Sequence, residues 1–370
     1  MQLLNLRAES LTHPEKPPPE GRPRRSPMRR GGGRTSGFNR LVMLSLWLVL
    51  GAMTATAQGP SVPPLPRTMQ IDGNTYVSLR HLARFYGFPR ARPVGNQLLL
   101  EDAYIRIEFE LNSRRIWVNG IAVWMHHPVT QHRRHWLVAE VDARTVLDPM
   151  LRPGPHVASL GYQRIVLDPG HGGSDPGGRG VQGSLEKELA LDLSHRVADY
   201  LRMANNEVFL TRTDDQTLSL SNRMELARSW QADLFVSLHF NTAANPAARG
   251  SETFLLAAGG QPGTQSSTAD SFPPATPANR FDGANQCLAY LVQQHLITHT
   301  QNQDRGVRRS RFFVLREATF PSILVEGGFL TNPEEEAKVL DHEYMERMAY
   351  GIAQGILAYQ SLVLRAQLEH

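Results

Sequence analysis

Four side chains that can bind a metal or move a proton are spread widely along the chain: His171, Glu186, His239 and Glu326. Two neutral imidazoles and one carboxylate form a ligand set that catalytic zinc sites use, with the fourth position left for water. A second carboxylate is then free for proton transfer. The types predict amide hydrolysis at one Zn²⁺ per chain. Because the residues are far apart in sequence, the alternative for each histidine is a hydrogen-bonded core residue.

The four residues stand at the ends of predicted elements. His171 follows the apolar strand RIVLD, and His239 ends the strand DLFVSLH. Glu326 ends the strand SILVE, and Glu186 opens a helix predicted over 186–203, where its charge suits the helix dipole. Ligands of open α/β sheets bind beyond the carboxyl ends of the strands. We therefore expect the four side chains to meet at one edge of a sheet.

Strands alternate with helices from Gln163 onward, which favours an α/β fold. Further strands are predicted at EVFLT and SETFLL, and further helices begin near Ser221, Asn285 and Tyr344. We expect a catalytic domain over 160–364 whose sheet is mostly parallel and is flanked by helices on both faces.

The motifs around these residues resemble the zinc-dependent N-acetylmuramoyl-L-alanine amidases of the amidase_3 family. They read, in order, IVLDPGHGGSDPG, LEKELALDLSHRVADYL, VFLTRTDDQTLSLSNRMELA, DLFVSLHFNTA and FFVLREATFPSILVEGGFLTNPEEE. The resemblance implies that His171, Glu186 and His239 bind zinc and that Glu326 is the catalytic acid/base. It also implies the substrate bond, the amide that joins N-acetylmuramic acid to L-alanine in peptidoglycan.

Other residues match the same family. Arg212, Asp215 and Arg223 fall in its TR…D…R stretch, and we interpret them as ion pairs around the site, with orientation of the metal ligands as the alternative. Asn241 also matches and is a candidate substrate contact. A Ser/Thr/Pro-rich insertion at 259–283 departs from the simplest members, and its composition predicts a flexible lid over the cleft rather than a helical plug.

A smaller unit precedes the catalytic domain at 67–150. It has short alternating strand patterns with Asp72-Gly73 and Asn119-Gly120 turns, and a helix from Leu79 to Phe85. This α+β unit resembles the copper amine oxidase N-terminal-like domain, which implies a wall-binding or spacer role and no copper chemistry. Its histidines at 126, 127, 132 and 135 lie among arginines, which disfavours a second metal site.

The first 57 residues are predicted to be an export signal with a basic N-terminal extension. Leu41 to Met53 is uncharged but shorter than the ~20 residues of a membrane span, and Ala55-Thr56-Ala57 offers a cleavage site. Met28 is an alternative translation start. A Pro-rich linker follows at 58–66. We expect an exported protein, periplasmic or cell-wall associated, without a permanent membrane span.

The charge balance argues against a nucleic-acid partner. The first 57 residues contain nine Lys and Arg against three acids, so the remainder carries 30 basic and 32 acidic residues. A polycationic surface is therefore not expected in the folded part. The lone cysteine, Cys287, is interpreted as a buried apolar residue.

Two alternative functions share the same residues. One is a zinc peptidase of the peptidoglycan stem peptide, and the other is a non-catalytic wall-binding adaptor. His295 and His299 share a helix face but lack an intervening glutamate, so we expect a solvated surface there. The partner indicated is peptidoglycan, and the sequence identifies no activator protein.

Overall fold

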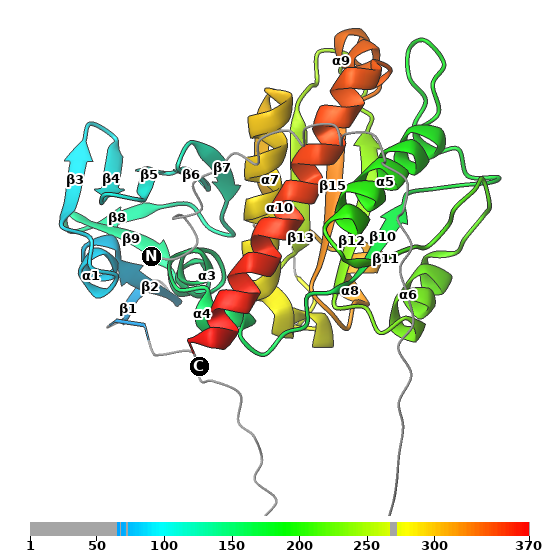
Figure 1. Cartoon of the computed structure of the whole chain (residues 1–370). Coiled ribbons are helices and arrows are strands. Elements are labelled where there is room, and N and C mark those ends of the chain that lie inside the picture. The colour runs from blue at the N-terminus through cyan, green and yellow to red at the C-terminus, as the bar shows by residue number, and fades with distance from the viewer. Residues whose placement is uncertain (1–64, 67, 72, 267–271, 370) are drawn as a thin grey trace, which may run out of the picture. The chain divides into compact units, whose positions relative to one another are not determined.

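The computed structural model describes residues 65–66, 68–71, 73–266 and 272–369 (Figure 1). The predicted signal at 1–57 and nearly all of the linker at 58–66 lie outside these residues, and both stay predictions. No helix within the described ranges is long and apolar enough to cross a membrane.

The principal sheet has eleven strands in the order β11-β10-β12-β15-β13-β14-β7-β6-β5-β4-β3. Its catalytic-domain strands are β10 (Arg164–Pro169), β11 (Glu207–Leu210), β12 (Leu234–Asn241), β13 (Ser251–Leu256), β14 (Asp304–Ser310) and β15 (Ser322–Phe329). The remaining strands are β3 (Arg90–Val94), β4 (Gln97–Glu101), β5 (Arg106–Glu110), β6 (Arg115–Val118) and β7 (Ile121–Trp124).

The expectation of a mostly parallel sheet was wrong, because the sheet is mixed. β11, β10, β12 and β15 run parallel, β13 runs antiparallel to β15, and β3 to β7 pair antiparallel. Only residues 242–250 join β12 to β13, which is too short for the crossover that a parallel strand needs. The chain therefore turns back at the edge where β12 ends.

The segment before the catalytic domain forms a second, four-stranded sheet in the order β1-β2-β9-β8. Its strands are β1 (Thr68–Ile71), β2 (Asn74–Ser78), β8 (Thr130–His132) and β9 (His135–Ala139). Helix α1 (Leu79–Phe85) has the predicted bounds, and the Asn119-Gly120 turn joins β6 to β7 as expected. β7 pairs with β14, which adds this segment's antiparallel strands to the principal sheet. The domain bounds and the family of this segment stay predictions.

Helices cover both faces of the principal sheet, as predicted. On one face lie α5 (Glu186–Met203), α7 (Asp282–Thr300) and α10 (His342–Leu368), and on the other lie α6 (Leu220–Ser229) and α8 (Phe313–Arg316) (Figure 1). The side chains of β12 alternate between these two faces, because successive residues of a strand point to opposite sides. Leu234, Val236 and Leu238 belong to the core under α5, α7 and α10, whereas Phe235 packs in the cluster with α6 and α8.

Connecting helices complete the described chain. They are α2 (Glu140–Asp142), α3 (Asp148–Leu151), α4 (Gly154–Val157) and α9 (Pro333–Val339), with a π-helical turn at Ala143–Leu147 and a 3-10 helix at Pro277–Phe281. Helix α6, which we predict to begin after a cap at Ser221, starts two residues earlier, at Leu220. Its N-cap is Ser219, whose side chain accepts a hydrogen bond from the Asn222 N–H, so Ser221 is not the cap.

The described parts of the insertion, 259–266 and 272–283, do not lie where a lid over the site would. β13 runs antiparallel to β15, so Leu256 lies at the edge where β15 begins, opposite the edge of Glu326. The segment returns to α7, which ends where β14 starts beside Ser251, so both ends of the insertion lie at the far edge. There Gln261 hydrogen-bonds His127. The described parts of the insertion therefore do not support the predicted lid over the cleft, because the antiparallel direction of β13 takes them away from Glu326.

Candidate metal centre and active site

Three parallel strands and one helix start bring the predicted residues to a single edge. His171 follows β10, His239 lies near the end of β12, and Glu186 is the first residue of α5. Glu326 of β15 stands directly opposite His239 in the strand register. The three candidate ligands place one donor atom each within 4.8 Å of one another, the one such cluster of histidine, cysteine and carboxylate side chains within the described ranges.

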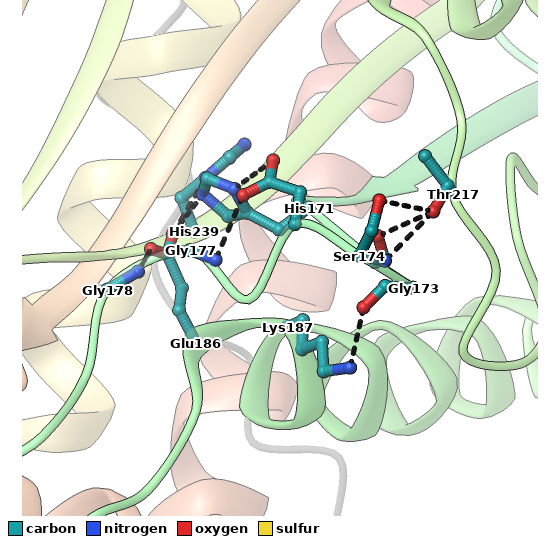
Figure 2. Close-up of polar contacts among 12 residues, drawn as sticks. His171, Gly173, Ser174, Gly177, Gly178, Glu186, Lys187, Thr217 and His239 are labelled. Atoms are coloured by element: carbon teal, nitrogen blue, oxygen red, sulfur yellow. Dashed lines mark hydrogen bonds and ion pairs between the residues drawn. The ribbon is translucent and has the colours of Figure 1, made fainter.

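The carboxylate of Glu186 lies between the two imidazoles (Figure 2). Its Oε1 is 2.8 Å from His239 Nδ1 and 3.1 Å from His171 Nε2. Donor atoms about 2.0–2.1 Å from a tetrahedral zinc stand roughly 3.3 Å apart, so these separations need little adjustment. Two nitrogens and one carboxylate oxygen also match the ligand types of catalytic zinc, and the donor set fits this ion.

The position of the His171 ring is fixed by its neighbours. Its Nδ1 lies 2.8 Å from Asp175 Oδ2, which leaves Nε2 for the metal. The backbone of His171 is left-handed, at φ 59°, a conformation that non-glycine residues adopt mainly at constrained sites. Burial lowers the pKa of His171, but the hydrogen bonds to Glu186 and Asp175 outweigh burial and raise it.

Two glycines make room for the imidazoles. A Cβ on Gly170 would lie 2.3 Å from His239 Cε1, and a Cβ on Gly177 would lie 2.5 Å from His171 Cδ2. The glycines of DPGHGGSDPGG are therefore required for space at these positions.

Glu186 is held in its charged form. Its Oε2 accepts a hydrogen bond of 2.7 Å from the Gly178 N–H, and its Oε1 accepts one of 3.1 Å from the Phe240 N–H. Burial would raise the pKa of this carboxyl, but the hydrogen bonds from His171 and His239 lower it well below its usual range. A metal ligand must be ionised, and this environment provides that.

Glu326 has the opposite environment. Its side chain is buried, and its Oε2 has no hydrogen-bond partner in the described structure. Burial, followed by the charges of Glu186 and Glu252, raises the pKa of Glu326 well above its ordinary value. This environment favours the protonated form, which can deliver a proton to a leaving group, and a metal ion at the neighbouring ligands would lower the pKa again so that the carboxylate can first accept that proton. A dication at the neighbouring ligands would oppose the two carboxylate charges.

Arg223 and Arg212 support the loop that contains His171. Arg223 Nη1 lies 2.7 Å from Asp168 Oδ1 in a buried ion pair, and Nη2 donates to the His171 carbonyl. Arg212 is buried too and donates to the carbonyls of Gly170 and Lys187. The expected ion pair is confirmed for Arg223, whereas Arg212 binds backbone carbonyls instead.

Asp215 pairs with Lys187 at 2.6 Å and accepts from the Gly173 N–H at 2.7 Å. Lys187 also donates to the Gly173 carbonyl, as Figure 2 shows. The hydrogen bonds from Lys187 and Gly173 lower the pKa of Asp215. These contacts join the loop after β10 to the first turn of α5, and so connect the segments that contain His171 and Glu186.

The other histidines stay apart from this centre. His295 and His299 stack with ring centroids 6.1 Å apart, and burial lowers the pKa of both. His126 is buried against Asp142 at 2.9 Å, a structural contact. Cys287 is fully buried, as expected.

Sequence reasoning missed Glu252. This residue of β13 is 1 % exposed and lies opposite Glu326 in the register. The signal was an acidic residue inside the otherwise uncharged strand SETFLL, which requires a buried partner. Its partners include the side chain of Asn241, 2.8 Å away.

Comparison with known proteins gives a consistent result. The Amidase_3 family model, described as N-acetylmuramoyl-L-alanine amidase, matches residues 165–358. N-acetylmuramoyl-L-alanine amidase AmiA of Salmonella typhimurium (strain LT2) is 33% identical over 228 residues, which cover 55% of this chain and 79% of that protein. AmiA of Escherichia coli (strain K12) is 32% identical over 223 residues, covering 54% and 77%.

A solved structure also matches, the catalytic domain of CwlV, an N-acetylmuramoyl-L-alanine amidase from Bacillus (Paenibacillus) polymyxa var. colistinus. It is 32% identical with a TM-score of 0.46 and covers 54% of this chain and 98% of that chain. The stretch matched by the family model contains all four residues of the candidate site.

Proposed function

The chain belongs to the amidase_3 family and hydrolyses the amide between N-acetylmuramic acid and L-alanine in peptidoglycan, and we propose that it does so with one zinc ion held by His171, Glu186 and His239. The observation that supports this proposal is the convergence of the three donor atoms beside a buried, unpartnered carboxyl. Zinc in such a site supplies Lewis-acid polarisation of the scissile carbonyl and acidifies water to a pKa of about 7.

The protein residues then have separate tasks. Glu186 stays ionised through its contacts with Gly178 and Phe240, and Asp175 fixes the ring of His171. Glu326 accepts the proton of the attacking water and returns it to the alanine nitrogen as the carbon–nitrogen bond breaks. Its burial excludes bulk water from this transfer.

Replacement of Glu326 tests the division of tasks. We expect Glu326→Gln to retain one zinc per chain and to lower turnover of purified muropeptides by about 10²- to 10⁴-fold. Glu186→Gln should lose zinc as well as turnover. Glu188→Gln, an exposed position in the same helix as Glu186, is the matched control and should preserve both. Wild-type turnover in Glu326→Gln would contradict the role of this residue.

Product analysis separates the amidase from a peptidase that uses the same site. The amidase releases intact stem peptide and leaves the N-acetylmuramic acid residues without peptide. Shortened peptides that remain on the glycan would instead indicate cleavage within the stem. A protein with zinc but no released product would indicate the adaptor.

Export is proposed from the segment before the described chain. The uncharged run from Leu41 to Met53, preceded by arginines and followed by Ala55-Thr56-Ala57, is typical of a cleaved signal. Peptidoglycan lies outside the cytoplasm, so an exported enzyme reaches its substrate. N-terminal sequencing of the mature protein tests this, with Gln58 expected as the first residue.

A further inference from the structure

An amide side chain stands beside the acid/base residue on the same face of the sheet. His239 opposes Glu326 in the parallel pair β12–β15, and Glu326 opposes Glu252 in the antiparallel pair β15–β13. The β12–β15 register shifts between His239 and Asn241, and it is the hydrogen bond from Asn241 to Glu252, the residue opposite Glu326, that places the Asn241 side chain on this face. The acid/base residue and Asn241 thus share one rim of the candidate active site.

The orientation of the Asn241 amide is determined by chemistry. Oε2 of Glu252 is 2.9 Å from Arg305 Nε and 2.5 Å from Arg308 Nη1, and guanidinium groups only donate. The two arginines hold Glu252 as a carboxylate, and a carboxylate only accepts. The atom of Asn241 that lies 2.8 Å from Glu252 Oε1 is therefore the amide nitrogen, Nδ2. Its carbonyl oxygen, Oδ1, is directed away from Glu252.

We propose that Asn241 Oδ1 accepts a hydrogen bond from the N–H of the scissile muramoyl–alanine amide, and that Glu252 is the positioning residue that fixes this orientation. Oδ1 has no hydrogen-bond partner within the described ranges and is left for the substrate. The inference rests on the proposed acid/base role of Glu326.

The proposed hydrogen bond from the scissile N–H to Asn241 Oδ1 would help the carbon–nitrogen bond to break. Water adds its hydroxide to the carbonyl carbon, its proton passes to Glu326, and the nitrogen becomes pyramidal. An acceptor that holds the N–H on one side turns the nitrogen lone pair to the other side. Glu326 can then deliver its proton to that lone pair, the carbon–nitrogen bond breaks, and the amine leaves.

Glu252→Gln inverts the orientation of the Asn241 amide without removing either side chain. The arginines require the oxygen of the new glutamine, so its NH₂ group must face Asn241. Asn241 then has to turn its own oxygen toward residue 252 and present NH₂ to the substrate. The Asn241 NH₂ group and the scissile N–H of the substrate, both donors, would then face each other. We expect kcat/KM on an N-acetylmuramoyl-L-alanyl peptide to fall about 10- to 100-fold with zinc retained.

A second substitution should restore activity. In Asn241→Asp combined with Glu252→Gln, one carboxylate oxygen of residue 241 accepts from the glutamine, and the other again faces the substrate N–H. The net charge of the pair is also unchanged. We expect kcat/KM of the double variant to be at least tenfold higher than that of Glu252→Gln alone. A merely structural role of Glu252 does not predict this recovery.

An ester substrate identifies the hydrogen atom involved. Replacing L-alanine by L-lactate in the muropeptide removes the scissile N–H and keeps the rest of the molecule. The Glu252→Gln variant should hydrolyse this ester within about threefold of the wild-type rate after subtraction of spontaneous hydrolysis. Equal losses on ester and amide, no loss on the amide, or no recovery in the double variant would overturn the proposal.

If Glu252→Gln does not yield folded protein, Asn241→Leu is compared with wild type on the amide and the ester instead. A loss on the amide alone supports the proposal, and equal losses on both substrates or no loss on the amide would overturn it. Wild-type zinc content and the Glu326→Gln kinetics judge the proposed function separately. A chain without zinc, or an active Glu326→Gln variant, would refute that function, whereas the ester comparison among zinc-loaded variants judges Asn241.

Discussion

Gly170→Ala is the sharpest mutational test of the metal site, because the only obstacle to alanine at this position is the space that its Cβ needs. Its φ lies outside the left-handed region, so the backbone accepts an L-residue, but the added Cβ would lie 2.3, 2.5 and 2.6 Å from three atoms of the His239 ring. Ordinary contact begins at 3.4 Å, and the ring would have to move by about 1 Å. Zinc ligands are held to within roughly 0.2 Å of their ideal distances.

We therefore expect Gly170→Ala to weaken zinc binding about 100-fold, since the displaced imidazole can no longer complete the ligand set. Competition with a chelator of known affinity measures this directly. Gly260→Ala is the control. Its Cβ meets nothing within 4 Å, but its φ of +68° costs about 1 kcal/mol, so it tests destabilisation without a clash at the site. Wild-type zinc affinity in Gly170→Ala would refute the geometry.

Three further predictions concern the residues around the centre. Arg223→Met leaves the buried Asp168 carboxylate without its cation, and urea unfolding should show a loss of about 3–5 kcal/mol. Asp175→Ala frees the His171 ring and should weaken zinc binding about tenfold by the same chelator competition. His126 accepts the Ala258 N–H through Nε2 and so is neutral, and burial lowers its pKa to about 4 despite its carboxylate partner. The unfolded histidine titrates near 6.5, so thermal stability of the metal-free protein should fall as the pH drops from about 6.5 toward 4, and His126→Gln should flatten that decline.

Controls for these predictions lie on the same elements. Arg228→Met changes an exposed arginine of α6 and should cost less than about 1 kcal/mol. A stability loss in Arg223→Met no larger than this would show that the buried pair contributes little. An identical pH profile for wild type and His126→Gln would contradict the neutral state of that ring.

The helix and the strands that carry the site residues could be predicted from the sequence. Helix 186–203 has its predicted bounds because its apolar residues recur at the helical period and Glu186 begins its first turn. The strands before His171, His239 and Glu326 are apolar runs ended by polar residues. Their carboxyl ends meet at one edge because the three strands are parallel neighbours.

The features that the sequence did not reveal depend on tertiary partners. β14 reads DRGVRRS, and local pattern alone does not favour a buried strand with so many charges. In the fold Arg308 pairs with Glu252, and Arg309 donates to Gln286 at 2.5 Å. The direction of β13, and with it the position of the insertion, depends on a short connection whose path local composition does not specify.

The central claim is that His171, Glu186 and His239 bind one zinc ion, and anomalous diffraction at the zinc edge from crystals of the zinc-loaded protein tests it most directly. We predict one peak per chain, about 2.0–2.2 Å from His171 Nε2, His239 Nδ1 and Glu186 Oε1. A peak at other residues, or none in protein that still hydrolyses muropeptides, would contradict the account.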